Sequence, residues 1–135
     1  MAITYYQANK ILDRAFGSST WDANATLYVG LSTNAISSDG TGAVEPLSAL
    51  GYSRVAVTND KTSWGSASSA SLKNSIQITF PESSSAWGAI TYVFIADALT
   101  SGNILYYDSL GTARTVAANT TVYFGVNNMT LSMTN

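Results

Sequence analysis

The 135-residue chain contains neither cysteine nor histidine, and these two absences exclude much of protein chemistry. Without cysteine there is no disulfide, no thiolate nucleophile and no sulfur–metal site. Without histidine there is no Ser-His-Asp or Cys-His catalytic arrangement, and most zinc and iron sites are excluded as well. Any catalysis would therefore have to rest on carboxylates.

Charged residues are also scarce. They make up 10% of the chain, whereas an ordinary domain has about 25%. The net charge is −2, and the six basic residues are spread singly along the sequence. No basic stripe exists that could neutralise several phosphates, so we expect no binding to nucleic acid. Small polar residues supply the solubility instead, which is typical of all-β proteins and of proteins whose surface is covered by neighbours.

Long apolar runs are missing too. No run approaches the roughly 20 residues that a membrane helix requires. The first 17 residues carry Lys10, Asp13 and Arg14 at positions where a secretory signal would need an apolar run. We therefore predict neither a secretory signal nor a membrane segment.

One amphipathic helix is predicted over residues 4–16. Thr4 followed by Gln7 fits a capping box, in which each side chain satisfies a free backbone donor of the first turn. Gly17 is placed to end the helix in the left-handed conformation. Four apolar residues fall on one face of this helix. They are Ala8, Leu12, Ala15 and Phe16.

After residue 24 the apolar pattern changes to the period of two that is typical of strands. Seven short strands are predicted, at residues 26–33, 52–58, 75–81, 90–96, 103–110, 120–126 and 129–133. The segment 90–96 is apolar on both faces and is predicted to be a central strand. The polar stretches 34–49 and 60–71 are predicted to be loops.

The length of the chain favours a single domain over residues 1–135. Residues 1–17 form its helix in this interpretation, as a possible docking element. Residues 24–135 form an all-β, antiparallel two-sheet sandwich of jelly-roll-like character, because short strands alternate with turn signals.

Carboxylates are the remaining candidates for catalysis. Asp97 and Asp108 flank a predicted hairpin, and a glycosidase needs two such carboxylates facing one cleft. Both are also common positions for aspartate in turns, which is the interpretation that we prefer. Glu82 lies in a loop with no acidic neighbour in sequence. We therefore assign no catalytic residue and do not expect an enzyme.

No metal or cofactor site is predicted. The stretches 37–42 and 59–63 contain oxygen donors, but neither has the alternating acidic spacing of a calcium loop. A phosphate-binding loop lies between a strand and the helix that follows it. Gly40 and Gly42 do not lie in such a position, so they do not form a phosphate-binding loop.

Aromatic residues are the better candidates for binding. Trp21, Trp64 and Trp87 fall in or beside predicted loops, where they could stack on sugars or pack in a core or an interface. We prefer packing, because tryptophan buries a large apolar area. The helix either covers an open end of the sheet or docks on a partner chain. The candidate partner contacts are Tyr5, Tyr6, Leu12, Phe16 and Trp87.

Several blocks of the sequence resemble a family of small structural proteins of tailed bacteriophages, described as fibre-like or head-decoration proteins. After the opening helix these blocks read ATLYVGLST, GYSRVAVTND, ITFPESSSAWGAITYVFIADA and GNILYYDSLGTARTVAANTTVYFGV, in the order found in the family. The most specific pieces are LYVGLST, the segment Gly51–Thr58 and the step Trp87–Thr91. The resemblance covers nearly the whole chain and offers no catalytic residues to carry over.

The resemblance implies a non-enzymatic component of the virion, assembled in the cytoplasm of the host bacterium. We expect an accessory protein on the capsid surface, either a decoration or cement protein or the base of a head fibre. The alternatives are a tail or tail-fibre component and a carbohydrate-binding module for host-surface glycans. Other virion proteins are the expected partners, together with further copies of the chain. A trimer is one candidate, because capsid lattices offer three-fold sites.

Overall fold

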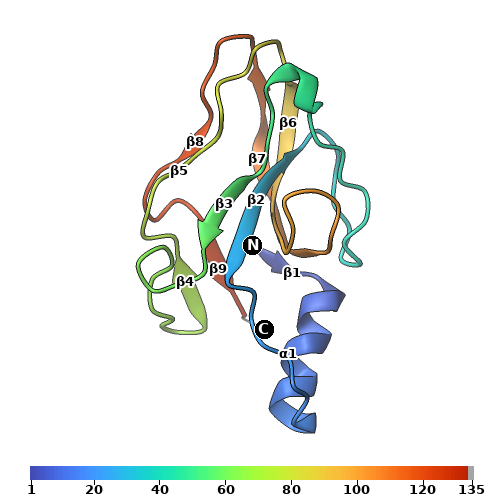
Figure 1. The fold of residues 1–135 in the computed structure, drawn as a ribbon, viewed down its shortest axis with the longest axis vertical. Helices are drawn as coiled ribbons and strands as arrows, with labels where there is room; N and C mark the ends of the chain where they lie inside the picture. Colours follow the sequence, from blue (N-terminus) through green and yellow to red (C-terminus); the bar gives the residue numbers. More distant parts are fainter. Residues whose placement is uncertain (134–135) are drawn as a thin grey trace.

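A computed structural model describes residues 1–133 of the chain, which are mostly β with one helix (Figure 1). The largest sheet has five strands, and every pairing within it is antiparallel. In spatial order these strands are β1 (Ala2–Ile3), β7 (Ile104–Val116), β6 (Gly88–Ala96), β2 (Thr26–Ser32) and β3 (Val55–Thr58). The middle strand β6 contains the segment 90–96, so its prediction as a central strand is confirmed.

Two short antiparallel ribbons form a second layer beside this sheet (Figure 1). The first ribbon pairs β4 (Ser71–Lys73) with β9 (Thr130–Ser132), and the second pairs β5 (Ile78–Thr79) with β8 (Tyr123–Phe124). The mostly β, antiparallel architecture with one helix is thus confirmed. The second layer is two separate ribbons where one continuous sheet was expected, and this topology does not confirm a jelly roll.

The apolar core lies between the two layers. Val29 and Leu31 of β2 alternate with side chains of the opposite face, and both are fully buried against the ribbons. Ile95 of β6 lies on the same face of the main sheet, and Ile78 of the second layer packs into the same core from the other side. The period of two that predicted these strands therefore also predicts which side chains enter the core.

The other face of the main sheet is covered by the segment 33–51, through Ile36 and Ala43. At the end of this segment a short 3-10 helix, η1 (Ser48–Leu50), packs Leu50 against the core between the two layers. Ile36 of this segment packs with Phe94 and Ala96 of β6. Phe94 lies directly opposite Gly30 in the β2–β6 ladder. A Cβ atom at residue 30 would overlap the Phe94 ring, so this strand position requires glycine because a neighbouring side chain occupies its space.

The ladder between β6 and β7 is irregular near its middle. Ile90 pairs with Arg114 and Tyr92 pairs with Ser109, so β7 has several more residues than β6 between these two pairs. Gly111, with a φ of 76°, lies in this bulge. Such a bulge bends a strand and locally increases its twist.

The helix α1 (Tyr5–Gly17) begins as the sequence predicts and ends differently. The Thr4 hydroxyl accepts a hydrogen bond from the Gln7 backbone N–H at 3.4 Å, which is half of the predicted capping box. In a reciprocal capping box the Gln7 side chain would accept a hydrogen bond from the Thr4 backbone N–H. Here that N–H donates to the Leu105 carbonyl of β7 at 2.9 Å instead. At the other end Gly17 remains helical and Ser18 takes the left-handed conformation, with a φ of 52°.

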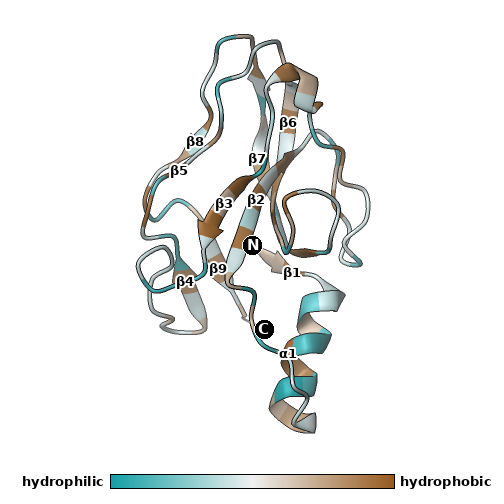
Figure 2. Ribbon diagram, in the orientation of Figure 1, coloured by the Kyte–Doolittle hydropathy of each residue, from teal (hydrophilic) through white to brown (hydrophobic). Residues whose placement is uncertain are grey.

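Most of α1 extends away from the sheet (Figures 1 and 2). Thr4 and Gln7 are buried against the domain, whereas Leu12 and Phe16 are 54% and 88% exposed. Figure 2 shows apolar residues on this extended helix as well as on the central strands. The helix therefore does not cover an open sheet end beyond its first turn. It is also neither long nor apolar enough to cross a membrane.

The contact between Gly30 and Phe94 gives a first prediction. We expect Gly30→Ala to lower the free energy of unfolding by about 1–3 kcal/mol, because the added methyl group forces the Phe94 ring out of place. Denaturant unfolding followed by tryptophan fluorescence measures this change.

Gly17→Ala is the matched control. Its new Cβ meets nothing within 4 Å, and alanine is a better helix former than glycine by up to about 1 kcal/mol. Equal stability of Gly30→Ala and the parent protein would contradict the packing argument.

Candidate functional site

The helix α1 presents a continuous apolar stripe to solvent. We define the helix stripe as Tyr5, Ala8, Leu12, Ala15 and Phe16. At 100° per residue, its three large side chains fall within about 40° of one another around the helix axis. Their exposed fractions are 62% for Tyr5, 54% for Leu12 and 88% for Phe16. An exposed apolar stripe of this kind is typical of surfaces that contact another protein.

Tyr6, the fourth helical candidate, lies outside the stripe. It is 37% exposed, about a quarter-turn away from Tyr5. The Lys10 ammonium lies 5.5 Å from the centre of its ring. Tyr6 therefore contacts a cation of its own helix and borders the stripe without belonging to it.

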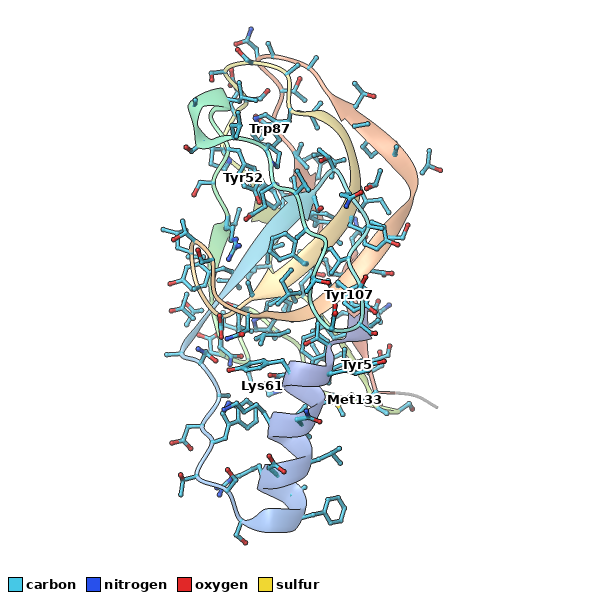
Figure 3. The ribbon with its side chains drawn as sticks, turned by 90° about the vertical axis from the view of Figure 1, so that its right-hand side faces the viewer. Tyr5, Tyr52, Lys61, Trp87, Tyr107 and Met133 are labelled. Atoms are coloured by element: carbon cyan, nitrogen blue, oxygen red, sulfur yellow. The ribbon has the colours of Figure 1, made fainter. Side chains whose placement is uncertain are left out.

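The opposite side of α1 is held by the rest of the chain. The Thr4 hydroxyl donates to the Ile104 carbonyl at 2.7 Å, and Gln7 is 8% exposed. Further along the helix, the Arg14 guanidinium donates to the Ser19 carbonyl at 3.1 Å, so the returning segment 18–25 covers this side. In Figure 3 Tyr5 lies on the side of the helix away from this segment.

Trp87 lies in the core of its own chain. It is 4% exposed, and its indole N–H donates to the Leu50 carbonyl at 2.9 Å. Its ring meets Tyr52 edge-on, with ring centres 5.4 Å apart (Figure 3 labels both residues). Trp87 thus faces the core of its own chain, and its buried side chain offers no open surface to a partner.

The other two tryptophans line a cavity of about 330 Å³ between the first turn of α1 and the domain. Trp64 is 4% exposed, and its indole N–H has no hydrogen-bond partner among the described residues. Trp21 is half-buried. A sugar platform needs an open ring face, and the buried rings of Trp64 and Trp87 do not supply one.

The structure does not bring the candidate carboxylates together. Asp97 closes the β6–β7 turn by accepting hydrogen bonds from the Asn103 backbone N–H at 2.7 Å and side-chain amide at 2.9 Å. Asp108 pairs with Val93, four residues before Asp97 on β6, which corresponds to about 13 Å along a strand. Glu82 is exposed. Within residues 1–133, no group of three or more acidic side chains could hold a metal ion.

A buried charge cluster lies on the face of the sheet that the segment 33–51 covers. Arg54, 8% exposed, forms a two-pronged ion pair with Glu45, with donor–acceptor distances of 2.9 Å and 2.8 Å. Its third nitrogen donates to the carbonyls of Ala98 at 2.6 Å and Ser101 at 2.9 Å. The guanidinium carbon lies 5.1 Å from the centre of the Phe94 ring.

Tyr52 completes this cluster. Its hydroxyl donates to Glu45 at 2.7 Å and accepts from the Leu31 backbone N–H at 2.9 Å. Burial, followed by the hydrogen bond to Glu45, raises the pKa of the Tyr52 phenol well above its usual value near 10. Every polar group of the cluster thus has a partner within the fold, which identifies it as a structural element and not as a reactive centre.

A known protein family matches the chain over nearly all of the fold described above. The matching model is described as Podophage GP4 fiber I protein gp80, and it covers residues 2–132, from β1 to β9. The chain belongs to this family. No curated protein matches the sequence.

Membership of the gp80 fibre family confirms the resemblance noted in the sequence. The chain is a structural component of a tailed-phage virion, where it associates with other virion components. The family match includes both α1 and the β domain, so the helix stripe is part of what the family model describes.

Sequence reasoning found the stripe and missed the charge cluster of this gp80-family chain. The stripe has a helical period that is visible in the residues themselves. Glu45 and Arg54 lie in a polar stretch and at a strand start, where charged residues are usually solvated. The one signal of this pair in the sequence is that a chain with so few charged residues places two of opposite sign nine residues apart.

The buried phenol gives a second prediction. An unfolded Tyr52 ionises near pH 10, whereas the folded one resists ionisation. Stability from this group is therefore complete below pH 10 and is lost as the pH rises above it, by up to about 1.4 kcal/mol per pH unit. Between pH 10 and pH 12 we expect the free energy of unfolding to fall less steeply with pH in Tyr52→Phe than in the parent protein. The difference in slope should correspond to about one proton released on unfolding.

Denaturant titrations at each pH measure this slope. Tyr52→Phe also loses two hydrogen bonds, so we compare the slopes and not the stability at a single pH. Tyr123→Phe removes a hydroxyl from a residue that is 60% exposed and controls for the substitution itself. Identical slopes in Tyr52→Phe and the parent would show that Tyr52 does not titrate on unfolding.

Proposed function

We propose that this chain is a non-enzymatic structural subunit of a virion fibre. The observation that carries the proposal is the match to a family described as a podophage fibre protein over residues 2–132. The structure supports it in two ways. The candidate carboxylates lie apart in ordinary turn and strand positions, and the helix stripe offers a protein-contact surface on an element that extends from the domain.

Among the accessory positions on the capsid surface, we favour the base of a head fibre over a decoration or cement protein. The family description names a fibre, which supports this role better than that of a cement layer. The same description also favours the alternative of a tail fibre. Both positions use the chain in the same physical way, as a β domain held to the particle by a protein contact.

The position of the chain on the particle gives a third prediction. We expect an epitope tag inserted in the exposed turn 66–70, which adjoins β4 on the other side of the domain from α1 in Figure 1, to be displayed on intact particles. Gold-conjugated antibody and electron microscopy then show where the label binds. The parent phage without the tag is the control for unspecific labelling.

Label on the capsid supports the head-fibre position, and label on the tail supports the tail-fibre alternative. If mass spectrometry of purified particles finds no copy of the chain, the proposal of a fibre subunit is wrong.

A further inference from the structure

We propose that the cavity between the first turn of α1 and the β domain is a binding site for a neutral saccharide. We call it the helix cavity, and the residues of its lining that bear on the ligand are Trp21, Asp60, Lys61 and Trp64. Such a site goes beyond the proposed function, because it gives a structural subunit a ligand and does not depend on where the chain lies on the particle.

The helix cavity has the size and the apolar lining of a small-molecule site. Its volume of about 330 Å³ lies within the roughly 300–1,000 Å³ that is usual for such sites. Four leucines from four strands, β2, β4, β7 and β9, supply much of the apolar lining. They are Leu27, Leu72, Leu105 and Leu131. Because these strands belong to both layers of the domain, this part of the cavity is formed by the fold itself.

Two exposed residues of opposite charge, Asp60 and Lys61, supply hydrogen-bonding groups to the helix cavity. The Asp60 Oδ1 atom accepts from the backbone N–H groups of Thr62 and Ser63 at 3.0 Å and 2.8 Å, and Oδ2 has no partner within residues 1–133. The Lys61 ammonium donates to the Gly65 carbonyl at 3.2 Å and keeps further N–H groups for other acceptors. A donor and an acceptor thus lie next to each other, which suits a hydroxyl group because it both donates and accepts.

Trp21 gives the helix cavity an aromatic wall. The side chain is half-buried, so part of it remains accessible. The stretch that carries it is tied to the rest of the chain on both sides. Arg14 donates to the Ser19 carbonyl at 3.1 Å, and the Asn59 amide donates to the Asn24 carbonyl at 2.7 Å. A ring held in this way can pack against the C–H face of a sugar with little further cost of ordering.

Trp64 contributes a hydrogen-bond donor that its own chain leaves unused. The residue is 4% exposed, and its indole N–H has no partner in the part of the chain that the structure describes. The equally buried Trp87 donates its indole N–H to the Leu50 carbonyl. Buried donors are nearly always paired, so an unused one on a residue of the cavity lining points to an acceptor from outside the chain. The indole nitrogen is covered in this structure, so the ring must shift for a ligand oxygen to reach it.

This combination of groups favours a neutral saccharide over other small molecules. A purely apolar ligand would leave Asp60 and Lys61 without a use, and an ionic ligand would meet a charge of its own sign beside the opposite one. A saccharide has a C–H face for Trp21 and the leucines, and it has hydroxyl groups for the charged pair. Figure 3 shows Lys61 beside α1, on the side where the segment 18–25 returns to the domain. The hydrogen-bonding groups therefore lie at the solvent side of the cavity and the apolar lining lies behind them.

Saturation-transfer difference NMR on the purified full-length chain tests for binding. The probes are neutral saccharides of glucose, galactose, mannose, rhamnose or N-acetylglucosamine, each with one to three rings. Glucuronic acid and glucosamine are the charged comparisons, and benzyl alcohol is the apolar one. We expect at least one neutral saccharide to bind more tightly than all three comparison molecules.

Three variants locate the binding. Trp21→Ala should weaken it by about 10-fold or more, because this change removes the aromatic wall. Trp64→Phe keeps a ring in the core and removes the N–H, and we expect a loss of about 3-fold to 10-fold. Tyr123→Ala is the matched aromatic control, since Tyr123 is 60% exposed and does not line the cavity. Circular dichroism confirms that each variant is folded.

The indole resonances give a readout that a purely structural role of these residues would not change. A ¹⁵N-labelled sample shows one indole N–H signal for each of the three tryptophans. We expect the bound saccharide to shift the signals of Trp21 and Trp64. The signal of Trp87 should stay in place, because its N–H is already bonded to the Leu50 carbonyl.

Three results would overturn the inference. The first is that no neutral saccharide binds, or that a charged probe or benzyl alcohol binds more tightly than every saccharide. The second is binding that Trp21→Ala and Trp64→Phe leave unchanged. The third is a shift of the Trp87 signal as large as that of Trp64. None of these results bears on the fibre proposal, which is decided by the presence of the chain on particles.

Discussion

The pairing of Arg54 with Glu45 is the interaction on which one whole face of the domain depends. A buried guanidinium is tolerated only when its donors are satisfied, because leaving a charge unpaired in a low-dielectric interior is costly. Arg54 meets this demand by bonding to two other parts of the chain. These are the segment 33–51, through Glu45, and the β6–β7 turn, through the carbonyls of both Ala98 and Ser101. Satisfying one side chain therefore fixes the covering segment, the start of β3 and the end of the central hairpin relative to one another.

The second layer depends on a buried amide in a comparable way. Asn74 is fully buried, and its side chain donates to the carbonyls of Ile76 at 2.8 Å and Gly125 at 2.9 Å. Its side-chain oxygen accepts from the Met129 N–H at 2.9 Å. The ribbons have only two or three paired residues each. Their placement therefore rests on this side chain and on the apolar core more than on strand pairing.

What the sequence predicts well is what depends on neighbouring residues. The helix start follows from Thr4 and its first turn, and the central strand follows from a segment that is apolar on both faces. The predicted strands 75–81 and 120–126 shrink to two residues each, because pairing requires a partner that alternation alone does not identify. The helical period revealed the stripe but not its direction, since amphipathicity does not say on which side of a helix the domain lies. The sequence also does not decide whether Trp87 faces its own core or another subunit, because an aromatic residue at a strand end suits a core and an interface equally.

The attachment of α1 also determines how a mechanical force would enter this protein. A pull on the helix enters the domain covalently through the segment 18–25, which leads to β2. It also enters non-covalently through the hydrogen bonds of Thr4 and through β1, which pairs with β7 over only two residues. From there it reaches β7, whose long ladder with β6 is the most extensive strand pairing in the sheet. The contacts of β1 and Thr4 are the weaker of the two attachments, because β2 is paired with a strand on each side. Under load, β1 and the first turn of α1 would separate from β7 first, and residues 18–25 would then pass the whole force to β2, inside the five-stranded sheet.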